Sequence, residues 1–245
     1  MAALIEYDST DSLVANDLAR FRVRGESEHN VRSLGKYKGT WNIPEDVAYD
    51  SFLEKLSSKL FTDGVEFYFS EVQRTDGYGY LYIDADIEMK GLGESADSDD
   101  EDDSDDEDDE DAKYENRGYN LGIVKSLIDI ALGVISEVSE EKVQIRKRSI
   151  ILEEKPAPTI KSGKLCDGFH IKFKDYIMPL AMRSYVISKI RERAGNLFEP
   201  VREKIVSGDP KQIIDEDVVA KNSIMFYGCT KEVGVMPYLA KFRYD

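Results

Sequence analysis

A long acidic run divides the chain and limits what can fold. The segment from Glu94 to Asp111 contains fourteen Asp or Glu residues and no Lys or Arg. Such a run repels itself and has little apolar surface to bury, so we predict a disordered insertion at 93–112 within one domain spanning 1–245. Removing these fourteen negative charges takes the net charge from −16 to −2. The rest of the chain is nearly neutral, and the low pI therefore does not exclude a nucleic-acid partner.

The cysteine and histidine content excludes several classes of protein. The chain has two cysteines and two histidines, with no CxxC pair or Cys/His cluster. A zinc site built from these residues and a disulfide scaffold are both disfavoured, which indicates a reducing, intracellular setting. The N-terminus lacks the basic and apolar regions of a signal peptide. No apolar run approaches the roughly 20 residues that span a bilayer, so we expect a soluble protein without a membrane partner.

Apolar periodicity predicts an α+β domain. Helical spacing marks the segments 43–61, 119–138 and 178–205. Alternation or short apolar runs predict strands at 64–72, 80–89, 142–152, 168–173 and 223–228. The first two strands lie close enough in sequence to form a hairpin, and 155–164 is predicted to be a loop. The mixture favours a mainly antiparallel sheet with helices on one face and an open opposite face.

The strand predicted at 80–89, YLYIDADIEM, places two like charges on one face. Its alternate residues from Leu81 to Met89 are apolar and should face the core, whereas Asp84 and Asp86 share the open face. Two close carboxylates resist joint ionisation, and a divalent cation such as Mg²⁺ reverses that penalty. Two metals can also clamp the attacking and leaving oxygens of a phosphoryl displacement. Taken alone, however, Asp-x-Asp is more often a solvated polar face.

Two further segments carry polar residues suited to the same chemistry. In DGFHIKF, alternation places His170 and Lys172 on an open face, where His170 can bind a phosphate oxygen. In IIDEDVVAKNSIMFYGCTK, Asp215 supplies a third carboxylate ahead of three polar or basic residues: Lys221, Asn222 and Lys231. Lysines can meet phosphates as point charges. Each segment taken singly has a plainer interpretation, an exposed histidine in one and a loop acid near a helix cap in the other.

Together the three segments resemble the catalytic domain of archaeo-eukaryotic primases. The resemblance is closest to the domain at the N-terminus of the primase–helicases of poxviruses and other large nucleocytoplasmic DNA viruses. The lead-in at 35–73 is similar to the family's helix and strand, YIDADI to its first motif, DGFHIKF to its second and IIDEDVVAKNSIMFYGCTK to its third. The final PYLAKFRYD resembles the approach to the helicase linker, so the resemblance covers most of the chain.

The resemblance implies a fold, an activity and a set of site residues. The fold is a primase-like core with an antiparallel, RRM-like sheet, and the activity is synthesis of short primers from nucleoside triphosphates on single-stranded DNA during viral-type replication. Asp84, Asp86 and Asp215 are implied as ligands of Mg²⁺ or Mn²⁺, and His170 as the contact of the triphosphate. The other expected nucleotide-binding residues are Lys172, Lys221, Asn222 and Lys231. Basic stretches supply the candidates for nucleic-acid binding: Arg146, Lys147, Arg148, Lys189 and Arg191.

Departures and missing motifs refine these expectations. DGFHIKF continues as FKD, where family members often have a proline after the phenylalanine, but no implied catalytic residue is lost. The chain lacks a GxxxxGK[ST] stretch, so a helicase domain or a helicase subunit is expected to follow residue 245. The expected location is the host cytoplasm, at the viral replication site, or the nucleus.

Two alternatives stand beside a primase. One is a primase-derived module that binds single-stranded nucleic acid with little catalysis of its own, although retention of all three acids and His170 argues against it. The other is a different Asp-x-Asp enzyme, such as a glycosyltransferase using a nucleotide sugar, which the missing secretory signal and the second and third motifs disfavour. For the acidic insertion, plain solvation is favoured over a role as a mimic of nucleic acid.

Overall fold

The computed structural model describes residues 17–24, 28–33, 38–72, 77–90, 114–139, 150–219, 222–231 and 236–243. The chain forms two compact units. The first comprises Met1–Gly79 with Asp217–Leu239, and the second comprises Tyr80–Glu216 with Ala240–Asp245. The acidic insertion at 93–112 lies outside the described residues, as do Lys221 and the basic stretch Arg146, Lys147 and Arg148.

The first unit is a small antiparallel sheet with one long helix. Its strand order is β1-β3-β2-β4-β9, and its described pairs are antiparallel. The strands are β1 (Arg22–Val23), β2 (Val31–Ser33), β3 (Gly39–Trp41), β4 (Phe69–Glu71) and β9 (Ile224–Met225). The helical segments are α2 (Val47–Phe61), with the 3-10 turns η2 (Ala19–Phe21) and η6 (Asp217–Val219).

Helix α2 begins at a capped residue and buries its apolar face on the sheet. The Asp46 carboxylate accepts the N–H of Ala48 at 2.8 Å, which satisfies a donor that the helix leaves open. Phe52 is buried on this helix, and its ring meets that of Phe69 on β4 edge to face at 5.6 Å. Trp41, 1% exposed, completes this aromatic core, which is the source of the unit's packing energy.

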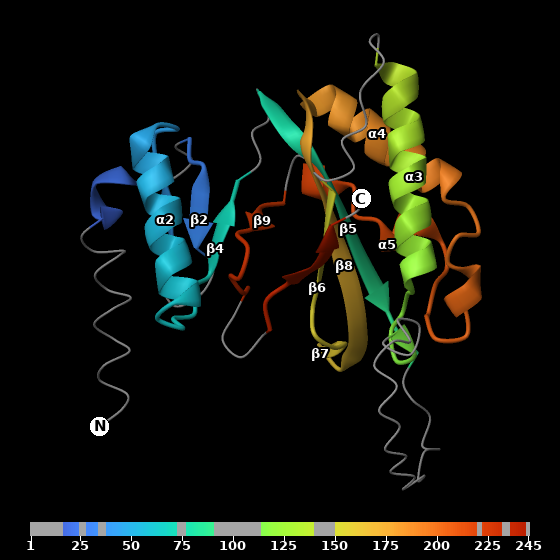
Figure 1. Ribbon diagram of the computed structural model, residues 1–245. Helices are drawn as coiled ribbons and strands as arrows, with labels where there is room; N and C mark the ends of the chain where they lie inside the picture. The colour runs from blue at the N-terminus through green and yellow to red at the C-terminus, as the bar shows by residue number, and fades with distance from the viewer. Residues whose placement is uncertain are drawn as a thin grey trace, which may run out of the picture. The chain divides into compact units, whose positions relative to one another are not determined.

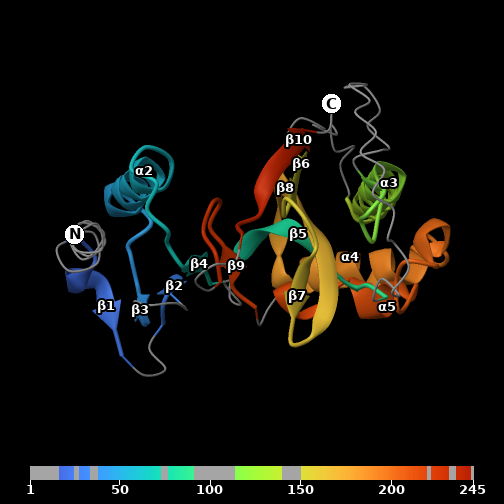
Figure 2. The ribbon, with the colours of Figure 1, turned by 90° about the horizontal axis from the view of Figure 1, so that it is seen from below.

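The second unit is a sheet whose described helices cover one face (Figures 1 and 2). Its strand order is β10-β6-β8-β5, with β7 paired to β8. The strands are β5 (Tyr78–Glu88), β6 (Ile150–Glu154), β7 (Thr159–Lys161), β8 (Lys164–Pro179) and β10 (Leu239–Arg243). The helical segments are α3 (Leu121–Val138), α4 (Leu180–Arg193), α5 (Pro210–Ile213) and the 3-10 turn η5 (Glu199–Val201).

Alternation along β5 and β8 creates the two faces of this sheet. On β8 the side chains of Phe169, Ile171 and Phe173 are fully buried, and on β5 the odd-numbered residues from Leu81 to Ile87 are at most 1% exposed. Helix α3 supplies the matching apolar surface, because nine of its residues are buried, and its N-cap Asn120 accepts the N–H of Ile123. The even-numbered residues of β5, and those of β8 around His170 and Lys172, are therefore left for the opposite face.

The fold confirms the predicted class and corrects several local predictions. The strands predicted at 64–72 and 223–228 are shorter, as β4 (Phe69–Glu71) and β9 (Ile224–Met225). The chain is α+β with antiparallel pairing, and helices occur at all three predicted segments. The hairpin between 64–72 and 80–89 is not formed, because β2 and β9 occupy the two edges of β4 and β5 belongs to the second sheet.

The region 155–164 is also more regular than predicted. It contains β7, and Ser162 and Gly163 turn the chain back into β8 with φ values of 52° and 78°. Two consecutive residues with positive φ make the tight turn that suits a two-residue hairpin. Strand β8 continues to Pro179, beyond the predicted 168–173. Lys174 and Asp175 are both exposed, and alternation then resumes in the opposite phase with Tyr176 and Met178 buried.

Candidate active site

Three aspartates occupy neighbouring positions on the open face of the second unit. Ala85 on β5 forms an antiparallel bridge with Ile214, and the Asp215 N–H donates to the Asp84 carbonyl at 2.9 Å. Residues opposite each other in an antiparallel pair point to the same face. Since Ala85 and Ile214 are buried, Asp215 lies on the same face as Asp84 and Asp86. This register brings together residues that are about 130 positions apart in the sequence.

The backbone places these carboxylates on one face, but the side chains are not gathered into a metal-binding group. Asp86 is exposed, whereas Asp84 and Asp215 are intermediate. Within the described ranges, no group of three or more His, Cys, Asp or Glu side chains is positioned to hold a metal ion. The Asp84 carboxylate instead lies toward His170. The predicted Mg²⁺ or Mn²⁺ ligands thus lie on the same face of the sheet, but their carboxylates do not converge on a common metal position.

His170 is the buried centre of the site. Its Nε2 lies 3.3 Å from Asp84 Oδ1, and its ring lies 5.1 Å from that of Tyr82 on the same face. The residue is 5% exposed. Burial by itself would lower the pKa of His170, but the nearby charge of Asp84, helped by Glu153, raises it above the ordinary histidine value. A cationic imidazole next to an aspartate is suited to meeting an anionic group.

Glu153 is a member of this site that the sequence analysis missed. It lies on β6 directly opposite His170, with Oε2 3.7 Å from Nδ1 of His170 and Oε1 2.7 Å from Nζ of Lys172. Burial would raise the pKa of Glu153, but its bonds to His170 and Lys172 lower it below the ordinary value. The residue sits in the apolar run SIILEE, where its partners are visible only once β6 and β8 are paired.

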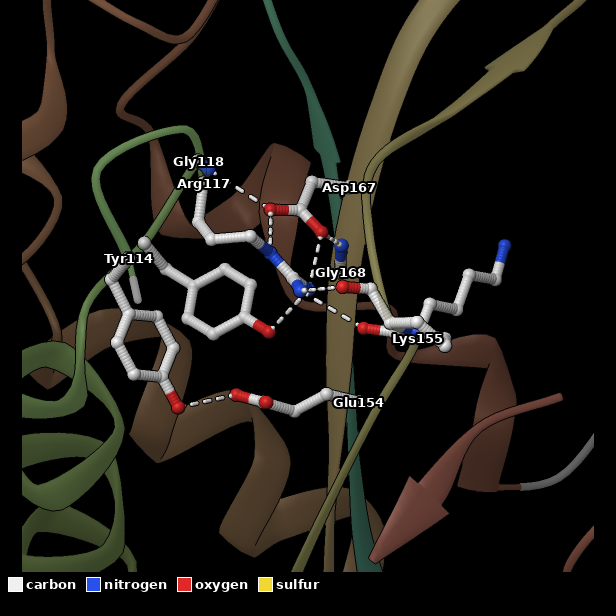
Figure 3. Close-up of polar contacts among 9 residues, drawn as sticks. Tyr114, Arg117, Gly118, Glu154, Lys155, Asp167 and Gly168 are labelled. Carbon is white, nitrogen blue, oxygen red and sulfur yellow. Dashed lines mark hydrogen bonds and ion pairs between the residues drawn. The ribbon is translucent and has the colours of Figure 1, made fainter. Parts of the chain in front are cut away.

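A second buried charge cluster lies on the reverse face of the same strands (Figure 3). Arg117 donates two hydrogen bonds to the Asp167 carboxylate, at 2.9 and 2.7 Å, and a third to the Lys155 carbonyl at 2.9 Å. Asp167 in turn accepts the backbone N–H groups of Gly118 and Gly168 at 2.9 and 2.8 Å. This cluster connects the segment before α3 to β8 at Asp167, three residues before His170. The sequence pattern gave no indication that Arg117 would take part in it.

The surface beside Asp86 is hollowed. An open pocket of about 210 Å³ adjoins this carboxylate. Polar and apolar residues line it together: Asp86, Glu88, Lys161, Cys166, Ser207 and Gln212 with Ile87, Val206 and Ile213. Lys164 forms an ion pair with Glu88 at 2.8 Å. The open face therefore offers space next to the carboxylates as well as charge.

The other described residues that were predicted to bind nucleic acid or nucleotide are already paired within the chain or belong to the first unit. On α4, Lys189 is paired with Glu192 at 2.6 Å, and Arg191 is paired with Glu216 and the Lys211 carbonyl, so both cations are already compensated by the chain. The other two described residues, Asn222 and Lys231, are exposed and belong to the first unit.

The comparison with known protein families decides the classification. The family model that matches is described as the C962R protein N-terminal AEP domain, where AEP denotes an archaeo-eukaryotic primase, and it covers residues 31–244. The chain belongs to this family. No curated protein matches it. Membership supports, at the level of the family, a primase or nucleotidyltransferase type of function with binding of nucleic acid and nucleoside triphosphates.

Two motif segments of the AEP domain lie in strands, as predicted, and the strand of the third is only β9 (Ile224–Met225). YIDADI is in β5, DGFHIKF is in β8, and the aspartate of the third segment follows α5. Among the described helices of this AEP domain, none combines the length and apolar content that crossing a membrane requires.

Proposed function

We propose that this AEP domain is a metal-dependent DNA primase that joins nucleotides into short primers on a single-stranded DNA template. The observation that supports this most is the register that sets Asp84, Asp86 and Asp215 on one face next to the buried His170. Three carboxylates and one buried cation form the charge pattern that phosphoryl transfer requires, namely oxygen ligands on one side and a phosphate contact on the other.

The proposed roles follow from the donor chemistry of the residues. Asp84, Asp86 and Asp215 would hold Mg²⁺ or Mn²⁺, since both are hard cations that take carboxylate oxygens. The bound metal would neutralise charge on the reacting phosphate and on the leaving pyrophosphate. His170 and Lys172 would contact the triphosphate of the incoming nucleotide, aligning its α-phosphate with the primer 3′-hydroxyl.

The carboxylates fit a hard cation in type and in the face they share, but not in their present side-chain directions. Asp84 is engaged with His170 at 3.3 Å, and no metal-binding group is gathered among the described residues. Metal binding would therefore require rotation of these side chains on a backbone whose register already sets them on one face.

The absence of a gathered metal-binding group among the described residues favours a second candidate. If the carboxylates do not gather, the domain would be a module that binds single-stranded nucleic acid without synthesis of its own. The two candidates agree on the ligand and differ only in chemistry, so a single assay with two readouts separates them.

The test incubates the purified chain with single-stranded DNA, labelled nucleoside triphosphates and Mg²⁺ or Mn²⁺. Short labelled products that disappear on addition of EDTA would support the primase. DNA binding without products would support the binding module, and neither binding nor products would contradict both. Running ribo- and deoxynucleotides in parallel reports which the enzyme prefers.

We further propose the biological setting that the sequence analysis expected. Primers would be made for viral-type DNA replication in the host cytoplasm or nucleus, together with a helicase domain or a helicase subunit. Co-purification of a helicase activity with the tagged protein is the direct check, and its absence would contradict a helicase partner.

A further inference from the structure

Glu153 is a charged residue in a position where a strand would ordinarily bury an apolar side chain. It is 4% exposed, and its strand neighbour Leu152 is 1% exposed. A buried carboxylate is tolerated only where partners replace the lost water. Glu153 has such partners on both oxygens, because one faces His170 Nδ1 at 3.7 Å and the other binds Lys172 Nζ at 2.7 Å. One carboxylate thus bridges two cations of the next strand.

This bridge restrains both cationic side chains. The imidazole of His170 has two nitrogens, and with Nδ1 toward Glu153 the other, Nε2, lies 3.3 Å from Asp84 Oδ1. Lys172 has a long flexible stem, and the bond to Glu153 holds its ammonium 5.9 Å from the centre of the Tyr82 ring. Restraining such side chains before a ligand arrives lowers the entropy that binding must otherwise spend.

We propose that Glu153 is a positioning residue that fixes His170 and Lys172 as a paired contact for the triphosphate of the incoming nucleotide. The inference rests on the proposed function and deepens it, since it names the residue that aligns the phosphate-binding side chains. Glu153 does not itself touch the nucleotide; as an anion it would repel phosphate, and its role is exerted through its two partners.

The neighbouring Glu154 provides a matched control. It is the next residue on β6, is 2% exposed, and points to the reverse face, where it accepts a hydrogen bond from the Tyr114 hydroxyl at 2.8 Å. Glu154→Gln therefore removes a buried carboxylate of the same strand without touching His170 or Lys172. A general weakening of β6 would affect both variants, whereas a positioning role would affect only Glu153→Gln.

The first measurement is the binding of ATP to the whole chain by calorimetry without added metal. Glu153→Gln should weaken ATP binding by about tenfold, on the scale of one charge-assisted hydrogen bond, and leave single-stranded DNA binding within about twofold. Glu154→Gln should leave ATP binding unchanged. Glu153→Asp, which keeps the charge on a shorter stem, should restore part of the loss.

The second measurement reads His170 directly. The chain has only two histidines, His29 and His170, so ¹⁵N-histidine labelling yields two imidazoles that a His29→Gln variant assigns. At one fixed pH, Glu153→Gln should shift the ring nitrogens of His170, while Glu154→Gln should not. His29 belongs to the first unit and serves as an internal reference.

The outcomes separate this inference from the proposed function. If wild-type protein makes no primers but Glu153→Gln still shifts His170 and weakens ATP binding, the primase proposal fails and the positioning role stands. Unchanged His170 signals in Glu153→Gln, or equal weakening of ATP binding in both glutamine variants, overturns the positioning role. Should Glu153→Gln fail to fold, Glu153→Asp decides: wild-type ATP affinity together with wild-type His170 signals overturns it.

Discussion

The two faces of the β6–β8 pair both bury charge, but they do so in different ways. On the reverse face, the Asp167 side chain has no exposed surface. Its carboxylate accepts two hydrogen bonds from Arg117 and two from backbone N–H groups. On the open face, the contacts of His170 are longer, at 3.3 and 3.7 Å, and the chain of charges runs outward toward the exposed Asp86.

The difference teaches how a buried charge can be assigned a role. A saturated cluster such as Arg117–Asp167 has no remaining capacity for a ligand, so its contribution is to the fold (Figure 3). A cluster with longer contacts that ends in an exposed carboxylate keeps interaction capacity for something outside the chain. Substitutions in the two clusters should therefore act differently, on stability in one and on activity in the other.

Breaking the closed cluster should destabilise the protein most. Asp167→Asn leaves Arg117 buried without its counter-charge, which is expected to lower the free energy of unfolding by about 3–5 kcal/mol. Urea unfolding measures this change. Asp175→Asn, an exposed change on the same strand, is the control and should stay within about 0.5 kcal/mol. A loss below about 1 kcal/mol for Asp167→Asn would mean that the cluster is not structural.

Changing the open face should remove activity while sparing the fold. Asp84→Ala or Asp86→Ala is expected to reduce primer synthesis by more than about 10²-fold, the scale of losing a principal electrostatic group. Thermal unfolding of Asp86→Ala should stay near the wild-type value because that side chain is exposed, and Asp84→Ala, which also loses the contact with His170 at 3.3 Å, should unfold at a slightly lower temperature. Synthesis at near-normal rates by either variant would remove these residues from the proposed site.

Removing the buried imidazole should separate nucleotide use from template binding. His170→Ala is expected to raise the KM for nucleoside triphosphate by about tenfold and to leave single-stranded DNA affinity within about twofold. Steady-state kinetics and a fluorescence titration with labelled DNA give the two values. Equal loss of both functions, or of neither, would indicate a structural histidine.

The two cysteines give the mildest probe of the open face. Cys166 lines the hollow beside Asp86, whereas Cys229 is 3% exposed in the core of the first unit. Burial raises the pKa of Cys229 to about 12, so at pH 8 its reactive thiolate is scarce and becomes abundant only as the pH approaches 12. Ellman's reagent at pH 8 should therefore show one fast thiol, which Cys166→Ser removes. Two fast thiols would contradict the burial of Cys229.

The fold class and the strands that carry Asp84, Asp86 and His170 could be predicted because they depend on local pattern. Alternation around these residues was enough to predict which of them share a strand face, but not that His170 is buried on that face. The β4–β5 hairpin was predicted wrongly because sequence proximity does not show which strand edges are already occupied. Glu153 was missed for a related reason, since its partners lie on another strand.

The sequence by itself therefore determined which side chains share a strand face, because the two-residue period is a property of the local backbone. It also determined the family, through three short motifs. Only the tertiary structure decided that Asp215 lies beside Asp84, that Glu153 bridges His170 and Lys172, and that Arg117 closes on Asp167. The physical reason is that register and burial arise from pairing between distant segments, and the stabilisation of a buried charge is set by the partners that this pairing supplies.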